Sequence, residues 1–229
     1  MKVIGVVGLP ASGKGEFSKI TSKRGVPVIV MGDMIRNAVK KGGMDPTDSN
    51  LGAIANKLRA ERGMDAIAHL CVPEIQRQTA PLVLVDGIRG DAEVAMFRRI
   101  FPGFTLISID SSFETRMARI KERGRSDDFK SADELRSRDL RELGWGLGNA
   151  LKNADMHLSN EASLAAFSFA VHTLLDTIGR DPRSSHPISR LHQKSGMIFP
   201  GYMVLKRQDM QDGRLLVTEI TSLLILHVF

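Results

Sequence analysis

Residues Gly8–Gly15, with the sequence GLPASGKG, carry the clearest chemistry in this chain. Glycines before a lysine let the backbone curl until successive amides point at a polyphosphate, and Lys14 then reaches its β and γ phosphates. The apolar run Val3–Val7 precedes the motif and a helix-like stretch follows it, which is the setting of a phosphate-binding loop, or P-loop. We therefore expect ATP to bind at Gly8, Leu9, Pro10, Ala11, Ser12, Gly13, Lys14, Gly15 and Glu16.

The residue after Lys14 departs from the usual motif. A Ser or Thr normally follows the lysine and holds Mg²⁺, but this chain has Gly15 there. Asp86 ends the apolar segment 81–86, and open parallel sheets place their ligands at such carboxyl ends. We expect Asp86 to hold Mg²⁺ directly or through water. The alternative is an aspartate that only begins a turn.

Two expected strand ends also carry arginines. The segment 32–36 reads GDMIR and the segment 86–89 reads DGIR. The planar fork of an arginine donates two parallel hydrogen bonds to a phosphate, so we expect Arg36 and Arg89 to hold an acceptor phosphate. Asp33 is expected to cap the helix that contains Arg36 and to contact the acceptor. The alternative is that both arginines are solvated surface residues.

Positive charge is densest between residues 116 and 141. Arg116, Arg119 and Arg123 recur at spacings of three and four, so they share one face of a helix. A helix, a short loop and a second helix would form a lid, about residues 119–138, that closes over the phosphates and excludes water. The alternative is a charged outer face, because Arg136, Arg138 and Arg141 cannot all point inward. The residues expected to be catalytic are Lys14, Arg119, Arg123, Arg125 and Arg136.

The elements that must position these residues alternate in type as far as about residue 180. Short β-branched runs alternate with longer helical segments, which predicts an α/β fold with a parallel sheet covered by helices. The expected strands are 2–7, 27–31, 82–86, 105–110 and 156–159. The expected helices are 14–24, 34–41, 51–62, 64–78, 92–100, 113–122, 132–143 and 161–178.

Three further segments can be interpreted from their composition. The glycine-rich string 144–149 follows a helix instead of a strand, so we interpret it as a connector in which Trp145 is a packing anchor. Residues 180–187 are typical of a linker. The β-leaning apolar segments within 197–229 would aggregate if exposed, so we expect them to pack on the main domain, on a protein partner or on a second copy. The alternative is that this segment is not under selection at all.

Composition limits the classes of function. The chain has 229 residues, which is long enough for one α/β domain with an appendage. Its net charge is +6. With a single Trp and a single Tyr available for stacking, a phosphorylated small molecule explains the basic residues better than nucleic acid does. Cys71 is the only cysteine, and no targeting or membrane segment is evident, so we expect a cytoplasmic protein without a membrane or nucleic-acid partner.

Together these motifs resemble those of nucleoside monophosphate kinases, the P-loop kinase group that includes adenylate kinase. GLPASGKG resembles the loop GxPGxGKG, GDMIR resembles GDxxR, and DGIR resembles DGFPR. Arg125–Asp128, with Arg136 eleven positions after Arg125, resembles the RxDD lid segment and its catalytic arginine. The segment 154–160 resembles the last strand of dephospho-coenzyme A kinases. Residues 1–178 as a whole resemble a group of archaeal nucleotide-kinase-like proteins.

The resemblance implies a P-loop NTPase fold for residues 1–180. Its sheet would have five parallel strands in the order 2-3-1-4-5, with helices on both faces, an acceptor-binding insertion at about 33–78 and a short lid. Residues 181–229 would be a linker and a C-terminal extension. The implied activity is transfer of the γ-phosphoryl group of ATP, with Mg²⁺, to a nucleotide or nucleotide-like acceptor.

Three departures from that group bear on the activity. Glu16 stands where adenylate kinases have a Thr that contacts phosphate and metal. DGIR lacks the Phe-Pro pair, so the acceptor need not be AMP, and Arg59 and Arg62 are open candidates for its pocket. If the acceptor is a hydroxyl, Asp33 is the candidate base. The alternative function is an ATP-binding switch or assembly protein with slow or no turnover.

Overall fold

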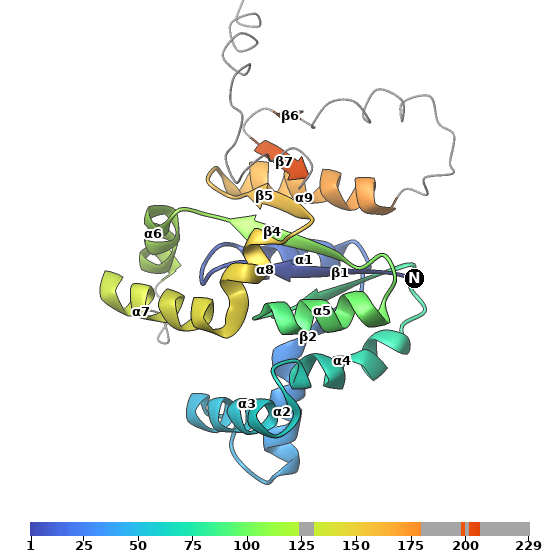
Figure 1. Cartoon of the computed structure of the whole chain (residues 1–229). Coiled ribbons are helices and arrows are strands. Elements are labelled where there is room, and N and C mark those ends of the chain that lie inside the picture. Colours follow the sequence, from blue (N-terminus) through green and yellow to red (C-terminus); the bar gives the residue numbers. More distant parts are fainter. Residues whose placement is uncertain (124–130, 180–197, 200–201, 207–229) are drawn as a thin grey trace, which may run out of the picture.

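The computed structural model describes residues 1–123, 131–179, 198–199 and 202–206, and it contains a parallel sheet of five strands. The strands lie side by side in the order β2-β3-β1-β4-β5, which confirms the expected fold (Figure 1). Their bounds are β1 (Lys2–Val7), β2 (Val28–Val30), β3 (Leu82–Asp86), β4 (Thr105–Asp110) and β5 (Met156–Ser159). The P-loop motif and Asn160 follow β1 and β5, and Asp86 is the last residue of β3, so all three lie at the same edge of the sheet.

The strands are nearly continuously apolar because both faces of the sheet are buried. In β1, Val3 and Val7 pack into a core on one face, while Ile4 and Val6 pack into a second core on the other. Strand β3 divides in the same way, with Val83 and Val85 in the first core. Successive side chains of a strand point to opposite faces of the sheet, so one run of apolar residues contributes to two separate cores.

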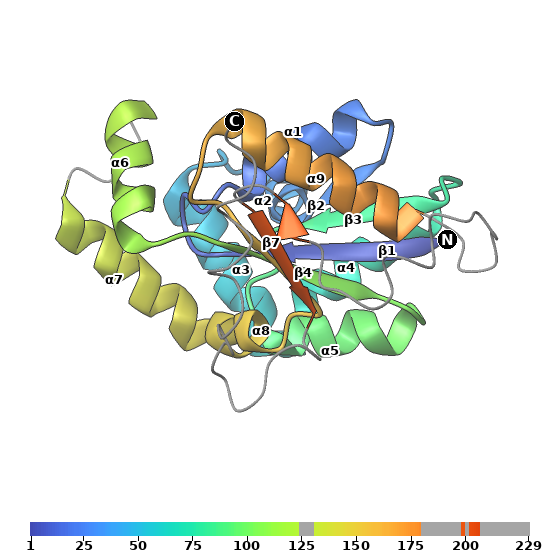
Figure 2. The same cartoon turned by 90° about the horizontal axis from the view of Figure 1, so that it is seen from above.

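Helices cover both faces of the sheet. Helices α1 (Lys14–Lys23) and α9 (Leu164–Gly179) pack against each other on one face (Figure 2). The other helices that the structure describes are α2 (Met31–Lys41), α3 (Asp48–Arg62), α4 (Ala66–Gln76), α5 (Asp91–Ile100), α6 (Phe113–Arg123), α7 (Ala132–Glu142), the π-helical turn η1 (Leu143–Leu147) and α8 (Gly148–Lys152). None of the helices in the described ranges is both long enough and apolar enough to cross a membrane.

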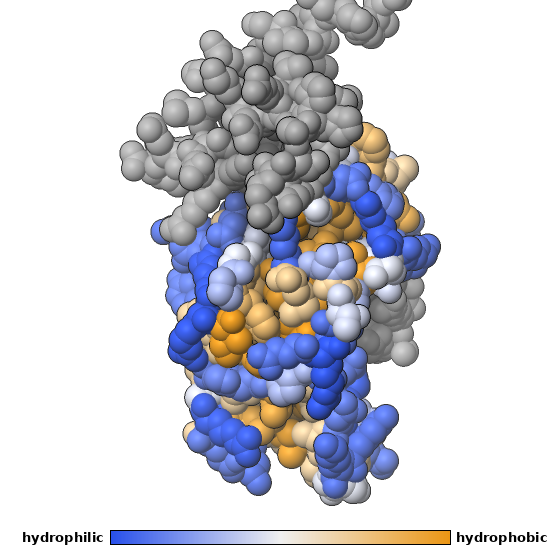
Figure 3. All heavy atoms as spheres, turned by 90° about the vertical axis from the view of Figure 1, so that its right-hand side faces the viewer, coloured by the Kyte–Doolittle hydropathy of each residue, from blue (hydrophilic) through white to orange (hydrophobic). Residues whose placement is uncertain are grey.

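The two ends of the strands open onto different surfaces. The loops that carry the expected site lie at the carboxyl ends, where α6 and α7 also stand (Figure 1). The amino ends face the side drawn in Figure 3, where apolar residues are framed by hydrophilic ones. The expected chemistry is therefore confined to one side of the molecule.

Part of the C-terminal extension joins the sheet. Strand β7 (Tyr202–Lys206) pairs antiparallel with the edge strand β5, and β6 (Ile198–Phe199) pairs with β7. The register sets His157 opposite Leu205. This pairing covers the backbone groups that β5 would otherwise expose as an edge strand. It agrees with the expectation that part of 197–229 packs on the main domain, whereas 207–229 lie outside the described residues.

One local expectation was wrong. Helix α2 begins at Met31, directly after β2, and its N-cap is Val30. Asp33 therefore lies inside the first turn, where its charge favours the helix dipole, and does not cap the helix. The string 144–149, interpreted as a connector, bends at Gly146 and joins α7 to α8. Gly146 permits this bend because its φ is 92°, a left-handed value that other residues rarely adopt.

Gly5 in the central strand provides a test of how tightly the first core is packed. A Cβ atom on Gly5 would lie 2.5 Å from Cδ1 of Ile88 and 2.6 Å from Cζ of Phe104. We expect Gly5→Ala to lower the free energy of unfolding by about 1–3 kcal/mol, measured by urea denaturation, because both side chains must shift. Gly52→Ala is the control: this exposed glycine of α3 has nothing within 4 Å, so alanine should stabilise the helix by about 0.5–1 kcal/mol. Equal effects from the two substitutions would contradict the packing argument.

Candidate nucleotide-binding site

The loop between β1 and α1 has the backbone that its glycines predict. Gly13 adopts a φ of 112° immediately before α1, and a Cβ atom there would lie 2.2 Å from Nδ2 of Asn160. That Asn160 amide donates a hydrogen bond to the carbonyl of Ser12 at 2.8 Å. Only glycine therefore fits between the start of the helix and the segment after β5.

One buried polar atom of this loop is left free for a ligand. The Ser12 side chain is 1 % exposed, and its Oγ has no hydrogen-bond partner among the described residues. A buried hydroxyl without a partner is costly, and a phosphate oxygen in the loop would accept its hydrogen bond. The loop residues thus fit a phosphate group.

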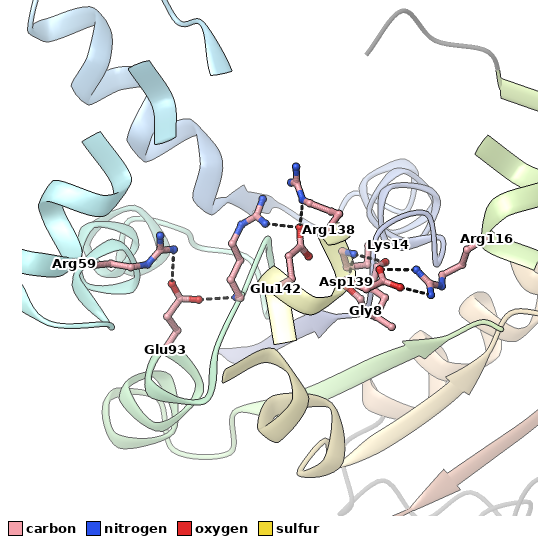
Figure 4. Close-up of polar contacts among 10 residues, drawn as sticks. Gly8, Lys14, Arg59, Glu93, Arg116, Arg138, Asp139 and Glu142 are labelled. Atoms are coloured by element: carbon pink, nitrogen blue, oxygen red, sulfur yellow. Dashed lines mark hydrogen bonds and ion pairs between the residues drawn. The ribbon is translucent and has the colours of Figure 1, made fainter. Parts of the chain in front are cut away.

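Lys14 is the first residue of α1, and its ammonium group turns back over the loop (Figure 4). Its Nζ donates hydrogen bonds to the carbonyls of Gly8 and, at 2.9 Å, Leu9. The pKa of Lys14 is lowered to about 8, chiefly by burial; the carboxylates of Glu142 and Asp86 oppose this shift, and the charges of Arg89 and Arg116 contribute to it. A bound polyphosphate would supply the negative charge that the ammonium lacks here.

The region around Asp86 contains a hydroxyl that the sequence interpretation missed. Ser18, one turn into α1, donates a hydrogen bond from Oγ to Oδ2 of Asp86 at 2.7 Å. Gly15 offers no side chain, and Glu16 forms an ion pair with Lys19 at 3.6 Å. The spacing Lys14 to Ser18 is one helical turn, so a hydroxyl does face this strand end, although three residues later than in the usual motif.

The described residues contain no cluster of three or more His, Cys, Asp or Glu side chains that could hold a metal ion. A Mg²⁺ ion at Asp86 would therefore take most of its ligands from nucleotide phosphates and water, which is usual for this ion. Asp86, at the strand end and beside Ser18, fits such a role with one carboxylate.

A continuous line of alternating charges runs beside Lys14 (Figure 4). Arg59 of α3 pairs with Glu93 of α5 at 3.7 Å, and Glu93 also accepts a hydrogen bond from the backbone amide of Arg89 at 2.7 Å. The Arg89 guanidinium donates to Glu142 of α7 at 3.0 Å, and Nε of Arg138 donates to the same oxygen at 2.7 Å. These contacts join three segments that are far apart in the sequence: α3, the segment 89–93 and α7.

The two carboxylates of this line are buried in different electrostatic surroundings. Burial raises the pKa of Glu93, and the Arg89 amide and the Arg59 charge oppose this without cancelling it. Burial also acts to raise the pKa of Glu142, but Arg89, Arg138 and Lys14 outweigh it, so that this pKa is lowered. Glu142 therefore stays ionised and neutralises cations beside the P-loop. Sequence reasoning missed both glutamates, because a glutamate in a charged helix looks like a solvated residue.

Arg116 and Arg119, which were expected to share one helix face, contact different partners. The buried Arg116 makes a bidentate ion pair with Asp139 of α7 at 2.8 and 2.7 Å and donates to the carbonyl of Pro10 at 3.2 Å. Arg119 donates to the Ser111 hydroxyl at 3.1 Å and to the Asn160 carbonyl at 2.7 Å. Arg116 thus fastens α7 to α6 and the P-loop, while Arg119 links the P-loop side of α6 to the end of β5.

Other residues expected in the site lie farther out. Arg36 is exposed and pairs with Asp33. Arg136 is exposed, pairs with Asp133 at 3.3 Å and stacks over the Phe113 ring at 4.9 Å. The side chain of Arg123 and all of Arg125 lie outside the described residues, as do residues 124–130 of the expected lid.

Comparison with known proteins places this arrangement in a family. The family model AAA_18, described as an AAA domain, matches residues 4–141. A UPF0200 protein of Methanoregula boonei is 65 % identical over 182 residues, which are 80 % of this chain and all of that relative. The chain belongs to the UPF0200 family. Another UPF0200 protein, from Methanosarcina acetivorans, is 49 % identical over 177 residues, 77 % of this chain and 95 % of the relative.

Solved structures agree on the fold of this UPF0200 chain. TT1252 from Thermus thermophilus superposes with a TM-score of 0.55 at 18 % identity, covering 77 % of this chain and 97 % of its own. A shikimate kinase from Bacteroides thetaiotaomicron gives 0.51 at 14 % identity, covering 78 % and 98 %. The expected resemblance to P-loop kinases is confirmed at the level of the fold, and this fold and loop indicate nucleotide binding.

The Arg116–Asp139 pair yields a prediction about stability. Asp139→Ala leaves a buried guanidinium without its carboxylate, so we expect the free energy of unfolding to fall by about 3–5 kcal/mol in guanidinium denaturation. Asp133→Asn breaks the exposed pair with Arg136 and should cost less than about 1 kcal/mol. If the two substitutions lower the free energy of unfolding equally, the buried ion pair of Arg116 with Asp139 is not the source of the stability.

Proposed function

We propose that this protein is an ATP-dependent phosphotransferase that moves the γ-phosphoryl group of ATP to a nucleotide or nucleotide-like acceptor. The observation that carries the proposal is the position of Lys14. Its ammonium group lies in the P-loop and interacts electrostatically with Asp86 and Arg89 at the end of β3 and with Glu142 of α7. A donor loop next to arginines at the carboxyl end of the sheet supports transfer rather than storage of a phosphate.

The reaction would need little covalent chemistry from the protein. An oxygen of the acceptor attacks the γ-phosphorus, the bond from that phosphorus to the β–γ bridging oxygen breaks, and ADP leaves with the bond's electrons. Lys14 and the loop amides would stabilise the β and γ oxygens. Arg119, Arg123, Arg125 and Arg136 would supply further positive charge when the lid closes.

The acceptor would lie on the opposite side of the transferring group. Arg89 would hold it at the end of β3, with Asp33 and Arg36 of α2 contacting it at the end of β2. A phosphate acceptor needs no strong base, whereas a hydroxyl acceptor would pass its proton to Asp33. Mg²⁺, when bound near Asp86, neutralises charge on the phosphates.

A second candidate function is an ATP-binding switch or assembly protein with slow turnover. It is favoured by the metal side of the loop, where Gly15 has no hydroxyl and Glu16 pairs with Lys19. Residues 197–229 would then contact a protein partner or a second copy. The two functions differ in turnover, not in ATP binding.

A panel assay separates them. Protein with ATP and Mg²⁺ is incubated with AMP, CMP, dCMP, UMP, GMP, TMP or dephospho-coenzyme A, and the product is identified by mass. We expect one acceptor class to gain a phosphate. Lys14→Ala should lower kcat by about 10²–10³-fold, because it removes the positive charge that stabilises the transferring phosphoryl group. Lys19→Ala, in the same helix but exposed, should retain activity. ATP binding without any product would reject the kinase and favour the switch.

The lowered pKa of Lys14 predicts a pH dependence of nucleotide binding. Above pH 8 the free protein loses the Lys14 proton, and a bound phosphate must restore it, so ADP affinity should fall by up to about tenfold per pH unit. Calorimetry in buffers of different ionisation enthalpy should record proton uptake on binding between pH 8 and 9. Lys14→Arg keeps its charge and should remove this uptake. If the unsubstituted protein binds ADP equally well at pH 8 and pH 9 and takes up no proton, the pKa of Lys14 is not lowered.

A further inference from the structure

The backbone carbonyl of Ser12, in the P-loop, is approached by donors from two other parts of the chain. The side-chain amide of Asn160, the residue after β5, donates a hydrogen bond to it at 2.8 Å. The Ser111 hydroxyl lies 3.1 Å from the same oxygen, and Nη1 of Arg119 lies 3.4 Å from it. A carbonyl oxygen has two lone pairs, and three donors compete for them here. The Ser12 carbonyl is therefore held from outside the loop.

Asn160 is itself fixed by further hydrogen bonds. The residue is 5 % exposed, and its backbone amide donates to the Asp110 carbonyl at 2.8 Å. Nη2 of Arg119 donates to the Asn160 carbonyl at 2.7 Å and to its Oδ1 at 3.1 Å. Because a guanidinium group only donates, the side-chain atom that faces it must be the oxygen, and the nitrogen faces Ser12. The two ends of this amide cannot exchange places without the loss of both side-chain hydrogen bonds.

The backbone of the loop needs such support. Ala11 has a φ of 61° and Gly13 a φ of 112°, so left-handed conformations stand on both sides of Ser12. A left-handed φ is unfavourable for alanine because of its Cβ atom, and it persists only where surrounding contacts enforce it. The contacts to the Ser12 carbonyl thus stabilise a conformation that the local sequence disfavours at Ala11.

A fixed Ser12 carbonyl also fixes the amide of Gly13. The two groups belong to one planar trans peptide, in which the N–H points opposite to the C=O. The carbonyl points toward Asn160, so the Gly13 amide points away from it. Backbone amides of this kind are the donors with which a glycine-rich loop binds a polyphosphate.

We propose that Asn160 is a positioning residue of the P-loop: its side-chain amide holds the Ser12–Gly13 peptide so that the Gly13 amide donates to a phosphate of the bound nucleotide. This inference rests on the nucleotide binding in the proposed function and needs no phosphoryl transfer. Close approach of Asn160 requires glycine at position 13, since a Cβ atom there would lie 2.2 Å from Nδ2 of Asn160. Asn160 acts only through the loop, so its substitution should change how the phosphates are bound.

The NMR resonance of the Gly13 amide provides a direct test. Isotope-labelled protein is titrated with ADP, and calorimetry gives the Kd. In the unsubstituted protein we expect the Gly13 amide proton to shift downfield as ADP saturates the site, because a charge-assisted hydrogen bond forms. Asn160→Ala should abolish this shift and weaken ADP binding by about tenfold or more, since a hydrogen bond to a charged group is lost.

Two further variants assign the effect to the side-chain donor. Asn153→Ala is the matched control, because the Asn153 amide also donates to a backbone carbonyl, that of Asn149 at 2.9 Å, but at the end of α8. It should leave the ADP affinity and the Gly13 shift unchanged. Asn160→Asp keeps the shape of the side chain and the oxygen for Arg119, yet its ionised carboxylate cannot donate to Ser12. It should also abolish the Gly13 shift, and it tests the proposal even if Asn160→Ala does not fold.

Two results would overturn the proposal. One is that both Asn160 variants retain the ADP affinity and the Gly13 shift. The other is weaker ADP binding with an unchanged Gly13 shift at saturation, which would make Asn160 a merely structural residue.

Failure of the kinase function would look different. A Gly13 shift that ADP induces and both Asn160 variants lose, without any product in the panel assay, would retain the role of Asn160 and reject the kinase. Phosphoryl transfer with the Gly13 shift unchanged in both variants would do the reverse. No binding of ADP by the unsubstituted protein would reject both proposals.

Discussion

The ammonium group of Lys14 sits where four parts of the chain converge, and the surrounding charges are arranged around it. Loop carbonyls accept its hydrogen bonds, and burial lowers its pKa to about 8. Two carboxylates from β3 and α7 offset part of this loss of hydration, while two arginines add to it. The free site is therefore short of negative charge, which is the property that a polyphosphate would correct.

Glu142 has a central part in this balance. It accepts hydrogen bonds from Arg89 and Arg138 and acts electrostatically on Lys14, so three cations share the single negative charge of this carboxylate. A ligand phosphate that approaches Arg89 would compete with Glu142 for the same guanidinium. Helix α7, which carries Glu142, also carries Arg141 and leads to Trp145.

The arginines between residues 116 and 141 serve different purposes despite their similar context. Arg116 is buried and pairs with Asp139, and Arg119 bonds to main-chain carbonyls. Arg136 is exposed, Arg138 pairs with Glu142, and Arg141 lies over the Trp145 ring. Helical spacing alone grouped Arg116 with Arg119, but it could not tell which acceptors the fold would bring to each of them. Asp139 and Asn160, the acceptors concerned, lie 23 and 41 residues away in the sequence.

The sequence by itself determined the P-loop, the five parallel strands and their order by family resemblance, and the position of Asp86 at a strand end. These features depend on local spacing, on glycine conformation and on the period of apolar residues, all of which short segments carry. Only the tertiary structure decided that Ser18 faces Asp86, that Glu93 and Glu142 join the arginines, and that Trp145 lies among three of them. Each of those contacts joins distant segments, and side-chain direction at such contacts is set by the packing of whole helices against the sheet.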